Sequence, residues 1–149
     1  MLIDYLNMTL YLNGRDIYVF VIGHAGVQGQ VVDLRAVECA PEERLAAMDA
    51  YMAEHGIARH AVTRVVAVEG PGSATALRAV LTMVNTWKVL VPELETVGVQ
   101  SGAELQVAAQ RAVFEQALKD SATKDRLVPV YEHAVRITAP TRDRLKRKL

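Results

Sequence analysis

A glycine-rich turn offers the clearest opportunity for chemistry in this chain, and it consists of Gly70, Pro71, Gly72 and Ser73. Backbone N–H groups of a turn at the start of a helix can bind a phosphate, and the helix dipole favours such an anion. The same glycines can instead serve only to reverse the chain sharply between a strand and a helix. Because no lysine follows the turn, as it does in a P-loop, and no magnesium ligand stands nearby, the structural role is the favoured interpretation.

No other residues have the spacing of a catalytic or metal-binding set. The histidines are scattered without an HxH or HxxxH pair, at His24, His55, His60 and His133. A metal-dependent nuclease or ATPase needs a carboxylate in or just after its first strand. Asn13 stands there, and although Asp16 could be recruited, no second and third carboxylate appear at matching strand ends. We therefore expect no catalytic residue, no metal site and no cofactor bound by this chain alone.

The strands that position the turn follow from short apolar runs. Runs rich in Val, Ile, Leu, Tyr and Phe at 8–12, 17–22 and 29–37 are separated by turn residues and predict an antiparallel meander. Further strands are predicted at 62–68, which ends at the turn, and at 94–99. An extended segment at 127–138 follows the last helix.

The helices alternate with these later strands. The first is predicted to begin at Pro41 and to end at Gly56, a C-terminal cap. The second has Ser73 as its N-cap and is stopped by Pro92, and the third begins at Ser101, where SGAE has capping-box spacing. The order β-β-β-α-β-α-β-α, plus a C-terminal extended segment, predicts an α/β fold of the ribonuclease-H-like or actin-like plan.

Length and composition predict one domain. The 149 residues carry 17 Lys and Arg against 17 Asp and Glu, a balance that argues against a protein that grips nucleic acid over most of its surface. We expect 1–126 to form a lobe, and 127–149 to form a return strand and a basic tail of the same domain. The tail's cations could contact RNA or form a solvated terminus: Arg142, Arg144, Lys146, Arg147 and Lys148.

The sequence also predicts a cytoplasmic protein without a membrane segment. No run approaches the roughly 18 apolar residues that span a bilayer. The first residues lack the basic and apolar regions of a signal peptide. Cys39 is the single cysteine, which excludes an internal disulfide and fits a reducing compartment.

Two predicted helices carry more apolar surface than one sheet can cover. At about 100° per residue, the 73–91 helix has an apolar arc of about 200°, roughly twice what packing on a sheet requires. Either the 41–56 helix buries the excess, or the two helices together face another protein, since interfaces favour Met and Trp. The predicted interface residues are Leu45, Met48, Tyr51, Met52, Ala76, Val80, Met83 and Trp87.

The turn and its helix resemble the TsaB family of tRNA threonylcarbamoyladenosine proteins. The stretch GPGSATALR, from Gly70 to Arg78, is similar to the family's GPGSFTGLR. Thr75 is among seven matches in nine residues, and Ala74 and Ala76 replace the usual Phe and Gly. Three other stretches resemble the family: LYLNGRDIYVFVIG, in which Asn13 stands where the family usually has Asp, ETVGVQSGAEL and PVYEHAVRITAP.

The resemblance implies an actin-like scaffold subunit in shortened form. Typical members carry a second lobe between the third helix and the closing segment, where this chain has only residues 119–127. In the family, the two apolar helices pack against those of the TsaD subunit or of a second TsaB as a four-helix bundle. The resemblance therefore implies a TsaD-like partner and a TsaE-like ATPase, with ATP or ADP bound only in the complex, and indirect contact with tRNA.

Two rival functions stay open at the level of sequence. One is a small metal- or nucleotide-dependent enzyme of the ribonuclease-H or actin-like class, with Asp16 as its acidic residue. The other is a self-associating homodimer with a structural role, formed through the same two helices. For Arg78, the pattern leaves open whether it braces the turn, faces a partner or points to solvent.

Overall fold

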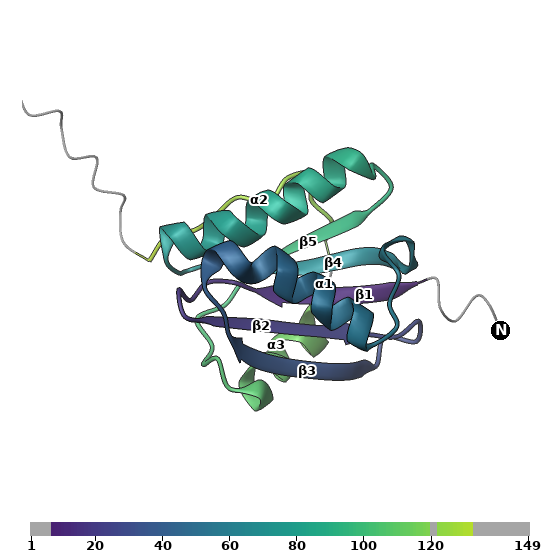
Figure 1. Cartoon of the computed structure of the whole chain (residues 1–149), viewed down its shortest axis with the longest axis horizontal. Helices are drawn as coiled ribbons and strands as arrows, with labels where there is room; N and C mark the ends of the chain where they lie inside the picture. Colours follow the sequence, from purple (N-terminus) through teal and green to yellow (C-terminus); the bar gives the residue numbers. More distant parts are fainter. Residues whose placement is uncertain (1–6, 120–121, 133–149) are drawn as a thin grey trace, which may run out of the picture.

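Strand β1 (Met8–Asn13) lies at the centre of a five-stranded sheet with the order β3-β2-β1-β4-β5 (Figure 1). The structure, a computed structural model, describes residues 7–119 and 122–132. On one side of β1, strands β2 (Val19–Ala25) and β3 (Val31–Glu38) pair antiparallel, as the meander prediction required. On the other side, β4 (Val62–Gly70) and β5 (Glu95–Gln100) run parallel to β1.

Helical crossovers connect the parallel strands. Helix α1 (Arg44–Glu54) follows a short 3-10 turn (Pro41–Glu43) and leads from β3 to β4, after a second 3-10 turn at Arg59–Ala61. Helix α2 (Ala74–Leu90) connects β4 to β5, and α3 (Val107–Lys119) follows β5. This arrangement confirms the predicted α/β class and the actin-like, ribonuclease-H-like plan.

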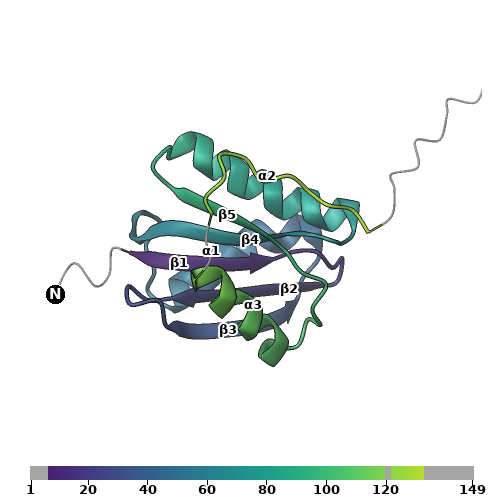
Figure 2. The ribbon, with the colours of Figure 1, turned by 180° about the vertical axis from the view of Figure 1, so that it is seen from behind.

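The sheet separates two hydrophobic cores. Helices α1 and α2 cover one face and α3 covers the other, as the view from behind makes clear (Figures 1 and 2). Alternation along a strand explains the division, because neighbouring side chains point to opposite faces. Leu10 and Leu12 pack under α1 and α2, whereas Tyr11 packs with Phe114 of α3, at 4.8 Å between ring centroids.

Several element boundaries differ from the predictions, and for two of them the structure gives a cause. The second strand begins at Val19 rather than at residue 17, because the Asp16 carboxylate accepts the backbone N–H groups of Tyr18 and Val19, both at 2.8 Å, and holds a turn there. The third helix begins at Val107 rather than at Ser101. The Ser101 hydroxyl accepts the N–H of Ala103 at 3.2 Å, so the expected capping box forms a local turn instead.

The described part of the C-terminal region forms a strap, residues 122–132, that runs along α2 (Figure 2). It bridges β5 at Val97 and Thr123, and it reaches the 70–73 turn, where Tyr131 bridges Gly72. Of the extended segment predicted from residue 127, residues 127–132 are described, and they form no regular strand beyond the isolated bridge at Tyr131. The rest of that segment lies outside the described residues, as do the predicted RNA contacts Arg142, Arg144, Lys146, Arg147 and Lys148.

Candidate partner-binding site

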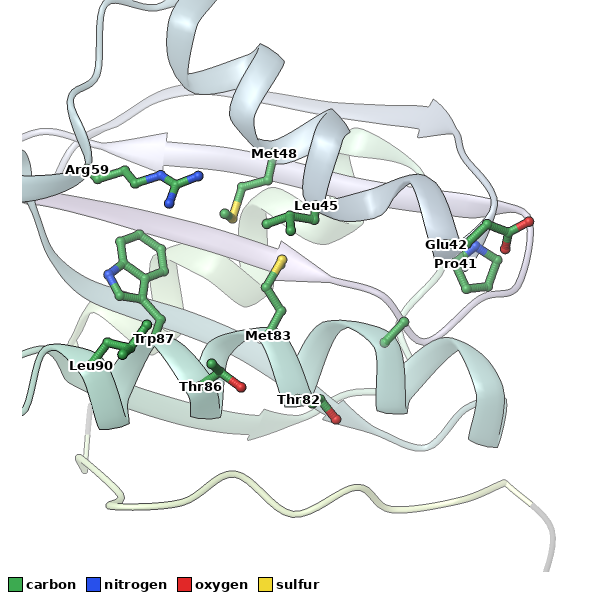
Figure 3. Close-up of a pocket in the computed structure, with 11 residues that line it drawn as sticks. Pro41, Glu42, Leu45, Met48, Arg59, Thr82, Met83, Thr86, Trp87 and Leu90 are labelled. Atoms are coloured by element: carbon green, nitrogen blue, oxygen red, sulfur yellow. The ribbon is translucent and has the colours of Figure 1, made fainter.

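An apolar groove of about 490 Å³ lies between α1 and α2. Figure 3 shows Leu45 and Met48 pointing from α1 toward Met83 of α2. Trp87 and Arg59 lie at one end of the groove, and Pro41 and Glu42 lie at the other (Figure 3). The remaining lining residues all come from α2: Ala79, Thr82, Thr86 and Leu90.

The packing of the two helices leaves this groove open. On α2, the side chains of Leu77, Leu81 and Val84 are buried against the sheet face, because they repeat at helical spacing. Met83 and Trp87 lie on the neighbouring side of α2, which lines the groove, and they are only half-buried. From the sequence, the apolar arc of this helix could be either buried by the first helix or exposed to a partner. In the structure, α1 covers part of the apolar arc of α2, and the rest is exposed in the groove.

The predicted interface residues therefore divide into two groups. Five are buried within the domain and hold the helices in place: Met48, Tyr51, Met52, Ala76 and Val80. The others have exposed area, and Leu45 is 52% exposed. Leu45, Met48, Met83 and Trp87 line the groove. Their contact with a partner remains a prediction.

The 70–73 turn is packed on both sides. Gly70 has φ of 138°, and a Cβ built on it would lie 2.1 Å from the backbone oxygen of Val130 in the strap. A Cβ on Gly72 would lie 2.5 Å from the backbone oxygen of Arg15. The Ser73 N–H donates to that same Arg15 oxygen at 2.9 Å, so it is already engaged. This packing supports the structural interpretation of the turn.

Ser73 also caps α2, as predicted from the sequence. Its hydroxyl accepts the N–H of Ala76 at 3.5 Å, and its own backbone is extended. Pro71 is half-buried, and Thr75 is exposed in the first turn of α2. The strap contacts Arg78 of α2. The Arg78 Nε donates to the Tyr131 hydroxyl at 3.1 Å, and the Arg78 guanidinium lies 5.6 Å from the centroid of the Tyr131 ring. Arg78 therefore braces the strap beside the turn.

The strap is held by buried polar contacts that sequence patterns did not reveal. Asn85 of α2 donates to the backbone oxygen of Leu127 at 2.9 Å and accepts its N–H at 2.8 Å. The Glu69 carboxylate, almost fully buried at the end of β4, accepts the Val128 N–H at 2.7 Å. It also pairs with Lys124 Nζ at 2.5 Å. A buried carboxylate needs such partners, because burial without them is costly.

Arg44 is a second buried polar residue near the groove whose role the sequence did not reveal. It stands in the first turn of α1, where solvent exposure is usual, yet it is 1% exposed. Its guanidinium donates to the backbone oxygens of Gly14, at 2.8 Å, and of Asp16, and it lies 5.5 Å from the Phe20 ring centroid. Burial lowers its pKa. Arg44 thus ties the start of α1, and with it one end of the groove, to the β1–β2 turn.

The crevice at the carboxyl ends of β1 and β4 is filled by the chain itself. Arg15 reaches across it and donates to the backbone oxygens of Pro71, at 3.2 Å, and Ala103, at 3.0 Å. Asn13, fully buried, donates from Nδ2 to Gln110 Oε1 at 2.7 Å. The Asp16 carboxylate holds the β1–β2 turn, as described above. Within residues 7–119 and 122–132, no group of three or more His, Cys, Asp or Glu side chains could hold a metal ion.

Among the comparisons with known proteins, only those with solved structures give a match. No protein-family model matches the chain, and no curated relative matches it. YeaZ from Pseudomonas aeruginosa matches with a TM-score of 0.57 and 23% identity, covering 74% of this chain and 50% of that chain. The chain has a YeaZ-like fold. YeaZ is TsaB, so the predicted resemblance is supported at the level of the fold.

A second solved structure gives the same result. It is the structure of an uncharacterized protein with similarity to peptidase YEAZ from Pseudomonas aeruginosa, and it matches with a TM-score of 0.57 and 21% identity. It too is covered over 50% of its length. This chain therefore spans about half the length of the YeaZ structures that it matches. Among the described residues, no helix is long and apolar enough to cross a membrane.

Proposed function

We propose that this chain is a TsaB-like partner subunit of the tRNA threonylcarbamoyladenosine machinery, and that its α1–α2 groove binds a TsaD-type transferase. The observation that carries the proposal is the groove itself, an apolar depression between the two helices that the family uses for pairing. The YeaZ-like fold and the GPGSATALR stretch support the choice of family. Neither of them identifies the partner.

The groove has the composition of a binding surface. Leu45 and Leu90 are 52% and 75% exposed, and covering such side chains contributes roughly 1.5–3 kcal/mol each when their burial becomes complete. Trp87 and Met83 are half-buried between them, and aromatic residues and Met are enriched in the centres of interfaces. A helix pair of the partner would place its own apolar ridge between α1 and α2.

In this proposal, the chain supplies an interface and no reacting group. The TsaD-type partner would transfer the threonylcarbamoyl group to adenosine 37 of ANN-decoding tRNAs, and a TsaE-like ATPase would complete the assembly. Nucleotide would bind at the level of that complex. The basic tail would contact tRNA, and the work of this chain would be to hold the transferase in its active arrangement. A cytoplasmic location follows from that role.

We also propose that the chain corresponds to one lobe of a TsaB protein. The strap supports this idea, because it returns to the 70–73 turn after a short link from α3 and packs there against Gly70 and Gly72.

The test is binding to the TsaD homologue of the same source, measured by copurification and by calorimetry. Leu90→Asp places a charge on the groove, and we expect it to weaken binding about tenfold or more, a loss of at least about 1.4 kcal/mol. Val89→Asp is the matched control, because Val89 is 77% exposed on the same helix turn but does not line the groove. If the unchanged chain does not bind the homologue, or if both variants weaken binding equally, the proposal fails.

The two rival functions give different results in the same experiments. A structural homodimer would show a mass of two chains by light scattering, and adding TsaD would not change it. A metal- or nucleotide-dependent enzyme would hydrolyse nucleotide or nucleic acid alone and would lose this activity in Asp16→Ala. Against the enzyme, the Asp16 carboxylate already accepts two backbone N–H groups at 2.8 Å.

A further inference from the structure

A second groove lies at the end of the sheet where the 70–73 turn is found. It occupies about 590 Å³ between the β1–β2 turn and the link from β3 to α1. Ile17 and Tyr18 line it, and Tyr18 is 75% exposed. Three exposed carboxylates, Glu38, Glu42 and Glu43, also line the groove and form its acidic wall. The groove therefore combines exposed apolar and aromatic surface with negative charge.

The negative charge of this groove is only partly balanced in the described part of the chain, where Arg44 has a coulombic interaction with Glu42. None of the three carboxylates forms an ion pair within residues 7–119 and 122–132. The neighbouring cation, Arg44, turns inward and donates to the backbone oxygens of Gly14 and Asp16. Three like charges within one short surface repel one another, so a cationic segment placed there relieves the repulsion.

Glu132, the last described residue before the chain's basic segment, lies at this end of the domain. The Glu132 N–H donates to the Gly72 oxygen at 3.0 Å, and the Ser73 N–H donates to the Arg15 oxygen at 2.9 Å. Arg15 belongs to the same turn as Ile17 and Tyr18. Arg142 lies ten positions after Glu132, and an extended chain of that length reaches about 33–36 Å. The cations of the tail are therefore within reach of the groove.

We propose that the basic segment 140–149 of the same chain occupies the groove formed by Ile17, Tyr18 and the three carboxylates. Its five cations oppose one aspartate, Asp143, and so complement the acidic wall. Arg guanidinium groups pair with carboxylates through two parallel hydrogen bonds and also stack on aromatic rings such as that of Tyr18. The groove offers carboxylates and an aromatic ring together, whereas a purely acidic surface offers only carboxylates.

A tail bound in this acidic groove would lie next to the apolar groove between α1 and α2. Pro41 and Glu42 line both grooves, so a tail bound at the acidic wall adjoins the apolar groove between α1 and α2. The bound tail is also hidden from an anionic partner such as RNA, which must compete with the carboxylates for the same cations. The inference does not depend on the proposed function, because it concerns only residues of this chain.

The experiment places a spin label at the end of the tail and measures which amide signals it broadens in the full chain. Leu149→Cys gives the attachment point in a chain that also carries Cys39→Ala, because Cys39 lines the groove and a label there would broaden the same signals. We expect broadening at Ile17, Tyr18 and Glu42, and none at Glu93, which is exposed beside the start of β5. Salt at 0.5 M screens exposed charge pairs and should remove the broadening.

The matched variant changes charge without changing shape. Glu38→Gln, Glu42→Gln and Glu43→Gln together should abolish the broadening, whereas Glu93→Gln should leave it unchanged. Broadening that persists in the triple variant, or that spreads evenly over the surface, overturns the proposal. A mixture of isotope-labelled chains without spin label and spin-labelled chains tests the source of the tail. Broadening in that mixture means that a second copy supplies it, which also overturns the proposal.

Discussion

Asn13 and Gln110 are joined by a buried hydrogen bond from Nδ2 to Oε1 at 2.7 Å, at the point where β1 ends and α3 crosses beneath it. The Gln110 oxygen also accepts the Tyr11 hydroxyl at 2.6 Å. On the other side of the amide, Gln110 Nε2 donates to the backbone oxygens of Ala103 and Glu104, at 3.5 and 2.9 Å. The two carbonyls fix the orientation of the Gln110 amide, so residue 13 must be a donor.

We predict that Asn13→Asp destabilises the fold by about 1–3 kcal/mol, because it places a carboxylate oxygen against the Gln110 oxygen at a fully buried site. Burial raises the pKa of such an introduced carboxyl, so the loss should grow as the pH rises above about 4. Urea unfolding at several pH values measures it. Asn7→Asp, at an exposed position, is the control and should change stability little. Equal effects of the two variants would contradict this account.

The sequence did not predict the structural role of position 13. Asn13 stood out only as the absence of an acidic residue that a metal site would need. Its real role depends on Gln110, 97 residues away, and on a helix that begins at Val107 rather than at Ser101. A long-range pair of this kind leaves no periodic signal in one sequence.

The order of the elements could be predicted because it follows from local patterns. The alternating apolar runs, the N-cap at Ser73 and the positive φ of 66° at Gly56 all depend on near neighbours in the chain. A predicted boundary can fail through a local contact, as at Asp16 before β2, or where a side chain from another segment competes with the local signal. The loop that replaces the first turns of the third helix is one case, because its carbonyls at Ala103 and Glu104 are bound by Gln110 and Arg15.

The candidate site was predicted in its location and not in its detail. Helical spacing identified the α1–α2 face, but it could not separate Leu45, which is exposed, from Met52, which is buried under the same helix. That division depends on how α1 lies on the sheet, which Arg44 sets through contacts with the β1–β2 turn. A charged residue in the first turn of a helix gives no sign of such a role.

The strap should open locally when its anchor on α2 is removed. Asn85→Ala deletes both hydrogen bonds to the Leu127 backbone, each contributing about 0.5–1.5 kcal/mol, so we expect a loss of about 1–3 kcal/mol. Hydrogen exchange should become faster at the Leu127 and Val128 amides before it changes in β1. Thr86→Ala, at the exposed neighbouring position, is the control. Unchanged exchange at Leu127 would mean that the strap is held elsewhere.

His24 predicts a pH dependence of stability. It is 3% exposed, its Nδ1 lies 2.7 Å from the Tyr51 hydroxyl, and His55, Asp33 and Arg35 are its ionisable neighbours. Burial lowers the pKa of His24, and the nearby His55 lowers it further, while Asp33 acts in the opposite direction. In the unfolded chain the imidazole takes up a proton below about pH 6.5, whereas in the folded chain it does so only at lower pH.

The unfolded state therefore binds more protons than the folded state just below pH 6.5, and the free energy of unfolding should fall as the pH decreases through this range. Denaturant unfolding at pH 7.5, 6.5 and 5.5 measures this slope. His24→Asn removes the titrating group and can keep a polar contact with Tyr51, so its slope should be smaller. His60→Asn, at an exposed position, should retain the original slope. A slope that is the same in all three proteins would show that His24 is not its source.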